Sequence, residues 1–198
     1  MLHANVLNPK HELMNTTTLI IHPKDPSTVF LNKVYDSITN KQVIQGGLTK
    51  KQVLPQIEIH ERILMMGHGS PLGLFAIGQF PKTSLNIVDK EMVSILKKKR
   101  NNVFIWCYAE KFIEALNLPG FATGMFISEV GEAIYCGLKG IDQKTVDESN
   151  SVFVNEISKT INLDSASIYE NIINGEYKLL AETNPVAKYN YDRMYYRS

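Results

Sequence analysis

The first two thirds of the chain alternate between short, continuously apolar runs and stretches whose apolar residues recur at helical spacing. The apolar runs predict strands buried on both faces, as in a parallel sheet. They comprise residues 17–25, 62–69 and 102–109; residues 121–128 are also predicted as a strand, and residues 41–47 could form a short one. A recurrence of apolar positions every three or four residues predicts helices. The helical stretches comprise residues 26–38, 89–99, 110–118 and 129–138.

Two segments between these elements fit no single pattern. Residues 49–61 have helical character, but Pro55 would break a helix in its middle, so they are predicted as a short helix and an extended link. Residues 71–80 alternate with glycines and are predicted to form a small hairpin arm.

Residues 139–198 are predicted as a helical C-terminal part with a tyrosine-rich tail. We expect those tyrosines to pack the tail onto the domain or to form a partner-binding surface.

The regular alternation of strands and helices predicts an α/β fold. Right-handed crossovers then give a mostly parallel sheet with helices on both faces. The length of 198 residues suits a single domain spanning residues 1–198. Residues 1–13 precede the first strong strand and are predicted to be a loosely held extension.

The charge and the composition of the chain exclude several classes of function. The chain has 21 basic and 20 acidic residues, a net charge of +1, and so lacks the basic excess of nucleic-acid or membrane-surface binders. Two cysteines are too few for a disulfide framework, and no metal-ligand spacing of His or Cys occurs. Neither a signal peptide nor an apolar stretch of membrane-helix length is evident. We therefore expect a cytoplasmic protein with free thiols, without a metal or another cofactor, that binds neither nucleic acid nor membranes.

Two of the apolar runs end at residues with acid–base or nucleophilic chemistry. In "ILMMGHGSPLGLF" (63–75) the apolar run stops at His68, and in "NVFIWCYAE" (102–110) it stops at Cys107. Ligands bind beyond the carboxyl ends of strands in an open parallel sheet, and one crossover joins these two strands. A cysteine nucleophile beside a histidine that moves the proton can catalyse acyl transfer. The backbone amides of Gly69 and Cys107 could stabilise the oxyanion.

In these two stretches the chain resembles the caspase-like cysteine peptidases, which include caspases, metacaspases, legumain, gingipain and clostripain. The resemblance covers roughly residues 17–138 and consists of the element order and the placement of His-Gly and Cys after apolar strands. It implies a three-layer caspase-like sandwich and a catalytic dyad. His68 would be the general acid and base, Cys107 the nucleophile, and Gly69 an oxyanion donor. The chain departs from the family pattern at Trp106 and Tyr108, which flank the cysteine with bulky side chains.

The same resemblance implies a substrate pocket near the ends of the strands beside the dyad. Asp25 and Glu129 are the acidic candidates for it, and Lys24 is the basic one. Acidic lining would favour a basic substrate residue, whereas Lys24 would favour an acidic one, and the sequence leaves both open.

The leading hypothesis is thus a cysteine endopeptidase acting on proteins or peptides. The resemblance also implies a role in signal-activated bacterial or antiviral defence, with a small molecule or a partner protein as activator. The rival hypothesis is a catalytically inactive caspase-like or flavodoxin-like module whose crevice binds a nucleotide-like ligand or a partner protein. In that case Cys107 would be a side chain packed in the hydrophobic core, and His68 would be a residue of a turn. A purely structural subunit is the third alternative. The sequence does not define the oligomeric state.

Overall fold

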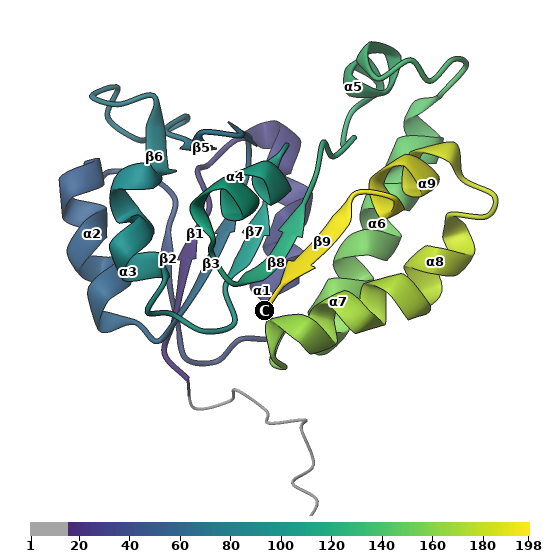
Figure 1. Ribbon diagram of the computed structural model, residues 1–198. Helices are drawn as coiled ribbons and strands as arrows, with labels where there is room; N and C mark the ends of the chain where they lie inside the picture. Colours follow the sequence, from purple (N-terminus) through teal and green to yellow (C-terminus); the bar gives the residue numbers. More distant parts are fainter. Residues whose placement is uncertain (1–15) are drawn as a thin grey trace, which may run out of the picture.

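The computed structural model describes residues 16–198 and shows a six-stranded sheet between two layers of helices (Figure 1). The extension predicted over residues 1–13 lies outside the described residues. The strand order is β2-β1-β3-β7-β8-β9, and all neighbours are parallel except β8 and β9. The predicted α/β sandwich with a mostly parallel sheet is therefore confirmed. The strands are β1 (Thr18–Ile21), β2 (Lys41–Ile44), β3 (Arg62–Met66), β7 (Val103–Ile105), β8 (Gly120–Thr123) and β9 (Met194–Arg197).

Helices cover both faces of the sheet, as predicted (Figure 1). One face packs against α2 (Lys50–Ile59), the 3₁₀ turn η2 (Lys90–Met92), α3 (Val93–Leu96) and α4 (Ala109–Leu116). The opposite face packs against the 3₁₀ helix η1 (Pro26–Leu31), α1 (Asn32–Tyr35), α6 (Gln143–Thr160), α7 (Ser165–Asn174), α8 (Glu176–Leu180) and α9 (Pro185–Tyr191). The short helix α5 (Val130–Tyr135) is fastened by a third, smaller apolar cluster.

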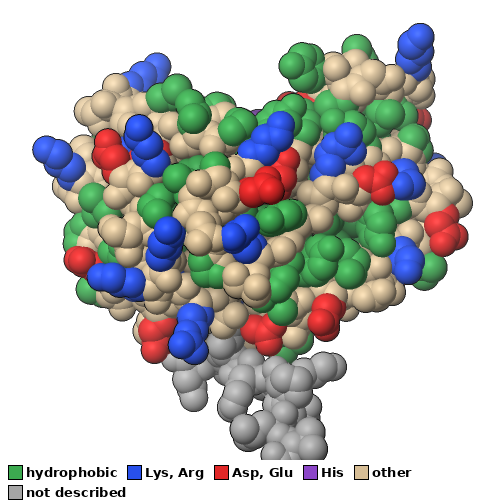
Figure 2. All heavy atoms as spheres, viewed as in Figure 1, with side chains coloured by type: hydrophobic (Ala, Val, Ile, Leu, Met, Phe, Trp, Pro, Cys, Tyr) green, Lys and Arg blue, Asp and Glu red, His purple; other side chains and the backbone are tan. Residues whose placement is uncertain are grey.

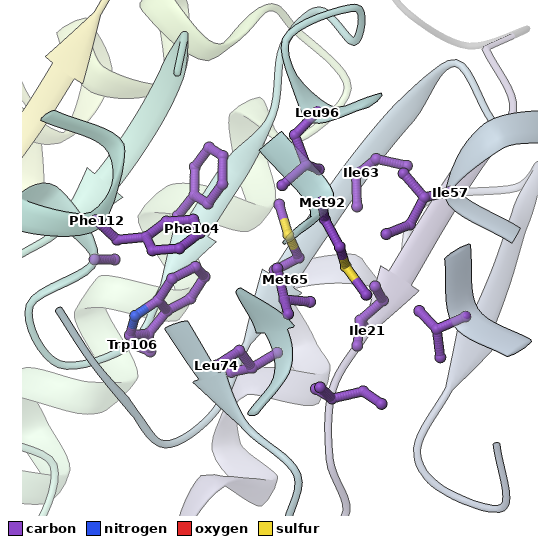
Figure 3. Packing of buried hydrophobic residues seen from close by; sticks show 14 of the residues in the cluster. Ile21, Ile57, Ile63, Met65, Leu74, Met92, Leu96, Phe104, Trp106 and Phe112 are labelled. Carbon is purple, nitrogen blue, oxygen red and sulfur yellow. The ribbon is translucent and has the colours of Figure 1, made fainter. Parts of the chain in front are cut away.

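The continuous apolar runs follow directly from this two-sided burial. Along β3, Ile63 and Met65 point into the core under α2 and α4, whereas Leu64 and Met66 point into the opposite core. Figure 3 shows Met65 in the first of these cores, among side chains from the neighbouring strands and helices. Each fully buried aliphatic side chain contributes roughly 1.5–3 kcal/mol to the free energy of folding.

A second, antiparallel sheet follows β3 and consists of β4 (Gly69–Ser70), β5 (Gly73–Phe75) and β6 (Asn86–Asp89). The first two strands form a hairpin over residues 69–75, which overlaps the arm predicted over 71–80 but begins and ends earlier, and β6 was not predicted. The helix predicted over 89–99 begins as expected, because the Asp89 side chain accepts from the Glu91 amide. It is shorter than predicted and consists of η2 and α3.

Two further differences from the sequence predictions have clear physical reasons. Helix α2 continues through Pro55, so the predicted break there is wrong. The carbonyl that loses its hydrogen-bond donor belongs to Lys51, which is exposed and can bind water, while Val53 and Ile57 anchor the helix in the core. The C-terminal tail forms α9 and then β9, which pairs antiparallel with β8, so the predicted packing of the tail is confirmed.

Candidate functional site

His68 and Cys107 lie side by side at the carboxyl edge of the sheet. Strands β3 and β7 are hydrogen-bonded neighbours in which Met66 is level with Ile105, and the Gly67 amide extends the ladder by donating to the Ile105 carbonyl at 3.0 Å. His68 and Cys107 each follow the last paired residue of their strand by two positions. Both residues line one small cavity of about 20 Å³. The structure thus brings the two predicted residues together.

A hydrogen-bonded relay orients His68. Its Nε2 lies 2.7 Å from Ser27 Oγ, and Ser27 Oγ lies 2.6 Å from Asp25 Oδ1. An ionised carboxylate can only accept, so the Ser27 hydroxyl donates to Asp25 and His68 Nε2–H donates to Ser27. The imidazole is then protonated at Nε2, which leaves Nδ1 with the lone pair that a base needs. The Ser27 hydroxyl is the main cause that lowers the pKa of Asp25, and His68 lowers it further.

The relay is built on the first turn after β1. Asp25 is the N-cap of η1, and its carboxylate accepts from the Ser27 amide at 2.9 Å as well as from the hydroxyl. Beneath this turn, His22 is buried and joins Thr28 (3.2 Å) to Tyr35 (3.0 Å). Burial lowers the pKa of His22 to about 4, so His22 is neutral at physiological pH and fixes the turn as a structural residue.

Cys107 has a different environment from His68. Its thiol donates to the Phe126 carbonyl oxygen at 3.6 Å, and no hydrogen bond joins it to His68 among residues 16–198. Burial raises the pKa of Cys107 to about 11, so the sulfur is a protonated thiol at neutral pH. Phe126 belongs to the segment between β8 and α5 and is itself packed on Phe153, with ring centroids 4.6 Å apart. The segment that connects β8 to α5 thus contacts the Cys107 thiol.

Of the two bulky neighbours of Cys107, Trp106 is among the residues that line the cavity and Tyr108 is not. The Trp106 indole is buried in the core with Phe104 and Phe112, and its Nε1 donates to the Ser70 carbonyl at 3.1 Å (Figure 3). Tyr108 has a positive φ of 67°, which is strained for an aromatic residue, and it serves as the N-cap of α4. This turn ends β7 abruptly and leaves Cys107 at the strand end.

Trp106 also explains the glycine after His68. A Cβ atom on Gly69 would lie 2.2 Å from the Trp106 ring and 2.7 Å from the Gly73 carbonyl oxygen, so only glycine fits. The His68 carbonyl accepts from the Phe75 amide at 2.9 Å. Because antiparallel pairing alternates along a strand, the Gly69 amide faces away from β5, but Gly69, the predicted oxyanion donor, is not among the residues that line the cavity of His68 and Cys107.

The predicted substrate residues lie in three different places. Lys24 is exposed and lines neither the cavity nor the groove beside it. Asp25 lines neither of them and is instead the acceptor at the end of the His68 relay. Glu129 is exposed and lines the groove.

Sequence reasoning missed two residues of the site. Ser27 connects Asp25 to His68, and the signal for it is the local Asp-Pro-Ser turn. Glu132 lines the cavity, and its carboxylate accepts from the Ser128 amide at 2.7 Å and the Ser128 hydroxyl at 3.0 Å. Its signal is the capping-box spacing of Glu129 and Glu132 at the start of α5.

A larger groove adjoins the small cavity. It has a volume of about 800 Å³, and its walls come from η1, α1, α6 and the start of α5. Phe30 and Ser128 line both spaces, so the groove and the cavity are neighbours. Figure 2 shows that the upper edge of the molecule is hollowed beside α5, at the edge where the parallel strands end.

Comparisons of the chain with protein-family models, with curated proteins and with solved structures each gave no match. Within residues 16–198, no helix is both long and apolar enough to cross a membrane. The same part of the chain has no group of three or more His, Cys, Asp or Glu side chains placed to hold a metal ion.

Proposed function

We propose that the chain is a cysteine peptidase of the caspase-like type, with His68 and Cys107 as its catalytic dyad. One observation carries the proposal: the register of two adjacent parallel strands places an oriented histidine and a cysteine in one cavity at the carboxyl edge of the sheet. The Asp25–Ser27 relay adds support, because a histidine with a fixed tautomer suits a proton-transfer role.

The first half of the reaction forms a thioester. His68 Nδ1 takes the proton from the Cys107 thiol, and the sulfur attacks the peptide carbonyl carbon to form a C–S bond. The Gly69 amide donates to the oxygen that gains negative charge. The tetrahedral intermediate collapses as the C–N bond breaks, and His68 delivers its proton to the leaving amine. Throughout, Asp25 and Ser27 hold the Nε2–H side of the ring.

The second half hydrolyses the thioester. His68 Nδ1 takes a proton from a water molecule, and the hydroxide attacks the same carbonyl carbon. The C–S bond then breaks, the carboxylic acid product leaves, and the proton on His68 returns to the Cys107 sulfur. Every proton thus passes through Nδ1, the nitrogen that the relay leaves free of a proton.

The conformation described here is a latent one under this proposal. The cavity beside the dyad is small, about 20 Å³. The protonated, partly buried Cys107 thiol must lose its contact with the Phe126 carbonyl before His68 can activate it. An activator, either a small molecule or a partner protein, would act by moving the segment around Phe126. Such activation fits an enzyme that responds to a signal.

A second candidate function is that of an inactive module that binds a ligand in the groove. The observation that favours it is the pKa of Cys107, which at about 11 leaves very little thiolate at neutral pH. The two proposals differ in whether displacement of the Phe126 segment produces catalysis.

The test is a peptide-library cleavage assay on the full chain, with and without candidate activators such as nucleotides. It compares the unmodified protein with Cys107→Ala, His68→Ala and the matched control Cys136→Ser. Cys136 is the other free cysteine and is also partly buried. We expect Cys107→Ala and His68→Ala to lower cleavage by at least about a thousandfold, and Cys136→Ser to retain it.

To reach the site without a known activator, the same assay uses Phe126→Ala, which removes the ring that packs on Phe153. We expect cleavage by Phe126→Ala that disappears in the double variant with Cys107→Ala. Cleavage that survives Cys107→Ala would refute the dyad. Binding of a nucleotide without cleavage in any variant would favour the inactive module.

A further inference from the structure

A separate pocket of about 300 Å³ lies between the small antiparallel sheet and helix α4. Its walls come from the turn between β4 and β5, from β6 and the start of η2, and from α4. None of its lining residues lines the dyad cavity or the groove beside it. A volume of this size is at the lower end of the range for small-molecule sites.

The walls of the pocket are mainly apolar. The apolar lining residues are Pro71, Leu72, Phe112, Ala115 and Leu116. Phe112 is buried, whereas Leu72 is 68% exposed, so a large apolar side chain stands open to water at the edge of the pocket. An occupant with an apolar body would remove this surface from water, which is favourable.

Asn86, which also lines the pocket, supplies a second and independent observation. It is 9% exposed, and only its backbone is engaged, with its carbonyl accepting from the Ser84 hydroxyl at 2.8 Å. Its Oδ1 is buried without a partner, and its side-chain amide makes no hydrogen bond within residues 16–198. Such an amide is costly unless a partner from outside the chain reaches it. Because Oδ1 is enclosed by the protein, Nδ2 is the atom left for a ligand, which must then supply an acceptor.

The charges around the pocket favour a neutral occupant. Its charged lining residues are Asp89 and Lys90, which have opposite signs. The Asp89 carboxylate accepts from the Glu91 amide at 2.9 Å and forms an ion pair with Lys50. Lys90 is exposed and therefore solvated. No unpaired charge is thus buried in the pocket to attract an ion.

The pocket adjoins the two supports of the Trp106 ring. The ring centroids of Phe112 and Trp106 are 5.5 Å apart, and Figure 3 shows the two side chains next to each other. Trp106 Nε1 donates at 3.1 Å to the carbonyl of Ser70, the residue before Pro71. An occupant between Pro71 and Phe112 therefore touches both neighbours of this indole, which is the only one in the chain.

We propose that this pocket binds a small neutral molecule with an apolar body and one hydrogen-bond acceptor, the carbonyl of an amide or an ester, which accepts from Asn86 Nδ2. The apolar body lies against Leu72, Phe112 and Leu116. This proposal does not depend on the peptidase function, because the pocket shares no lining residue with the dyad cavity.

Binding is tested on the full chain with N-cyclohexylacetamide, which has an apolar ring and an amide carbonyl and does not absorb where tryptophan is excited. ¹H–¹⁵N NMR spectra report the side-chain amide of Asn86, and fluorescence reports Trp106. We expect saturable binding with a Kd of about 1 mM or tighter, and changes in both signals. Acetamide lacks the ring, and cyclohexylammonium replaces the carbonyl with a charge, so each is expected to bind at least about tenfold more weakly. Absence of saturable NMR shifts, or equal binding of either control compound, would overturn the proposal.

Variants then locate the binding site. Asn86→Leu should weaken binding at least about fivefold and leave the free energy of unfolding unchanged or higher, because the amide has no partner in the protein to lose. A less stable Asn86→Leu protein would show that the amide serves the fold instead.

A second variant fills the pocket from an exposed position. Ala115→Phe should abolish binding, since Ala115 lies on the exposed side of α4 and lines the pocket. Glu114→Phe is the matched control, because Glu114 is exposed on the same helix and lies outside the pocket. Unchanged binding in Ala115→Phe, or an equal loss in Glu114→Phe, would contradict the location.

Discussion

The two halves of the candidate site differ in how far each is prepared for chemistry. His68 is 28% exposed and is oriented by Ser27 and Asp25. Cys107 is partly buried, and its thiol is protonated and donates to the backbone carbonyl of Phe126. Under the proposed function, the base is therefore oriented while the nucleophile is held as a thiol. Such a division suits an enzyme that is regulated by access to its cysteine rather than by assembly of its dyad.

The difference also has a structural origin. The His68 half depends on the turn after β1, which is fixed by the buried side chain of His22. The Cys107 half depends on the loop after β8, where the Phe126 carbonyl accepts from the thiol. A signal could thus move the second segment without disturbing the first.

The largest expected effect comes from Gly69, where the two halves touch. In Gly69→Ala the new Cβ would clash with the Trp106 ring and with the Gly73 carbonyl, so we expect a loss of about 3 kcal/mol in the free energy of unfolding. Gly131→Ala is the matched control, because a Cβ there would meet nothing within 4 Å. Urea denaturation measures both. A stability loss in Gly69→Ala no larger than in Gly131→Ala would contradict the packing of Trp106 against β4.

The next effect concerns the turn that carries the relay. The pKa of His22 is about 4 in the folded protein and 6.5 in the absence of burial, so the unfolded chain takes up a proton first as the pH falls. The stabilising contribution of neutral His22 is complete above pH 6.5 and is lost as the pH falls towards 4, by up to roughly 3 kcal/mol. Urea denaturation at pH 7 and pH 4.5 should show a smaller loss in His22→Gln. Equal losses in both proteins would contradict a buried, neutral His22.

A smaller effect is expected from the relay itself. Ser27→Ala and Asp25→Asn should reduce the population of the Nε2–H tautomer of His68, which ¹⁵N imidazole spectra report directly. In a protein activated by Phe126→Ala, we expect cleavage to fall by about tenfold in each variant. Glu182→Gln provides the control for the loss of a charge. An unchanged tautomer in Asp25→Asn would show that Asp25 does not position His68.

Much of the fold and the centre of the site could be predicted from the sequence. The uninterrupted apolar runs reflect strands buried on both faces, and their ends at His68 and Cys107 identify the edge of the sheet. One crossover between neighbouring parallel strands suffices to bring the two residues together. These inferences need only local patterns and the rules of parallel sheets.

The remaining features depend on contacts that no local pattern encodes. Ser27 meets His68 only because β1 pairs with β3, and the Phe126 carbonyl meets Cys107 only through the path of a loop. The pairing of β9 with β8 likewise depends on the packing of the helices that precede it. The identity of the residues around a site is therefore harder to predict than the site itself.

The most direct test of the shielded nucleophile is the pH dependence of Cys107 alkylation by iodoacetamide in the folded Cys136→Ser protein. We predict a rate at pH 7 about a hundredfold below that of a thiol with a pKa of 9.0, rising steadily through pH 10 without levelling off, and the same profile in His68→Ala. A rate that levels off below pH 8 and falls in His68→Ala would contradict this prediction, because it would show a thiolate already paired with His68 in the resting protein.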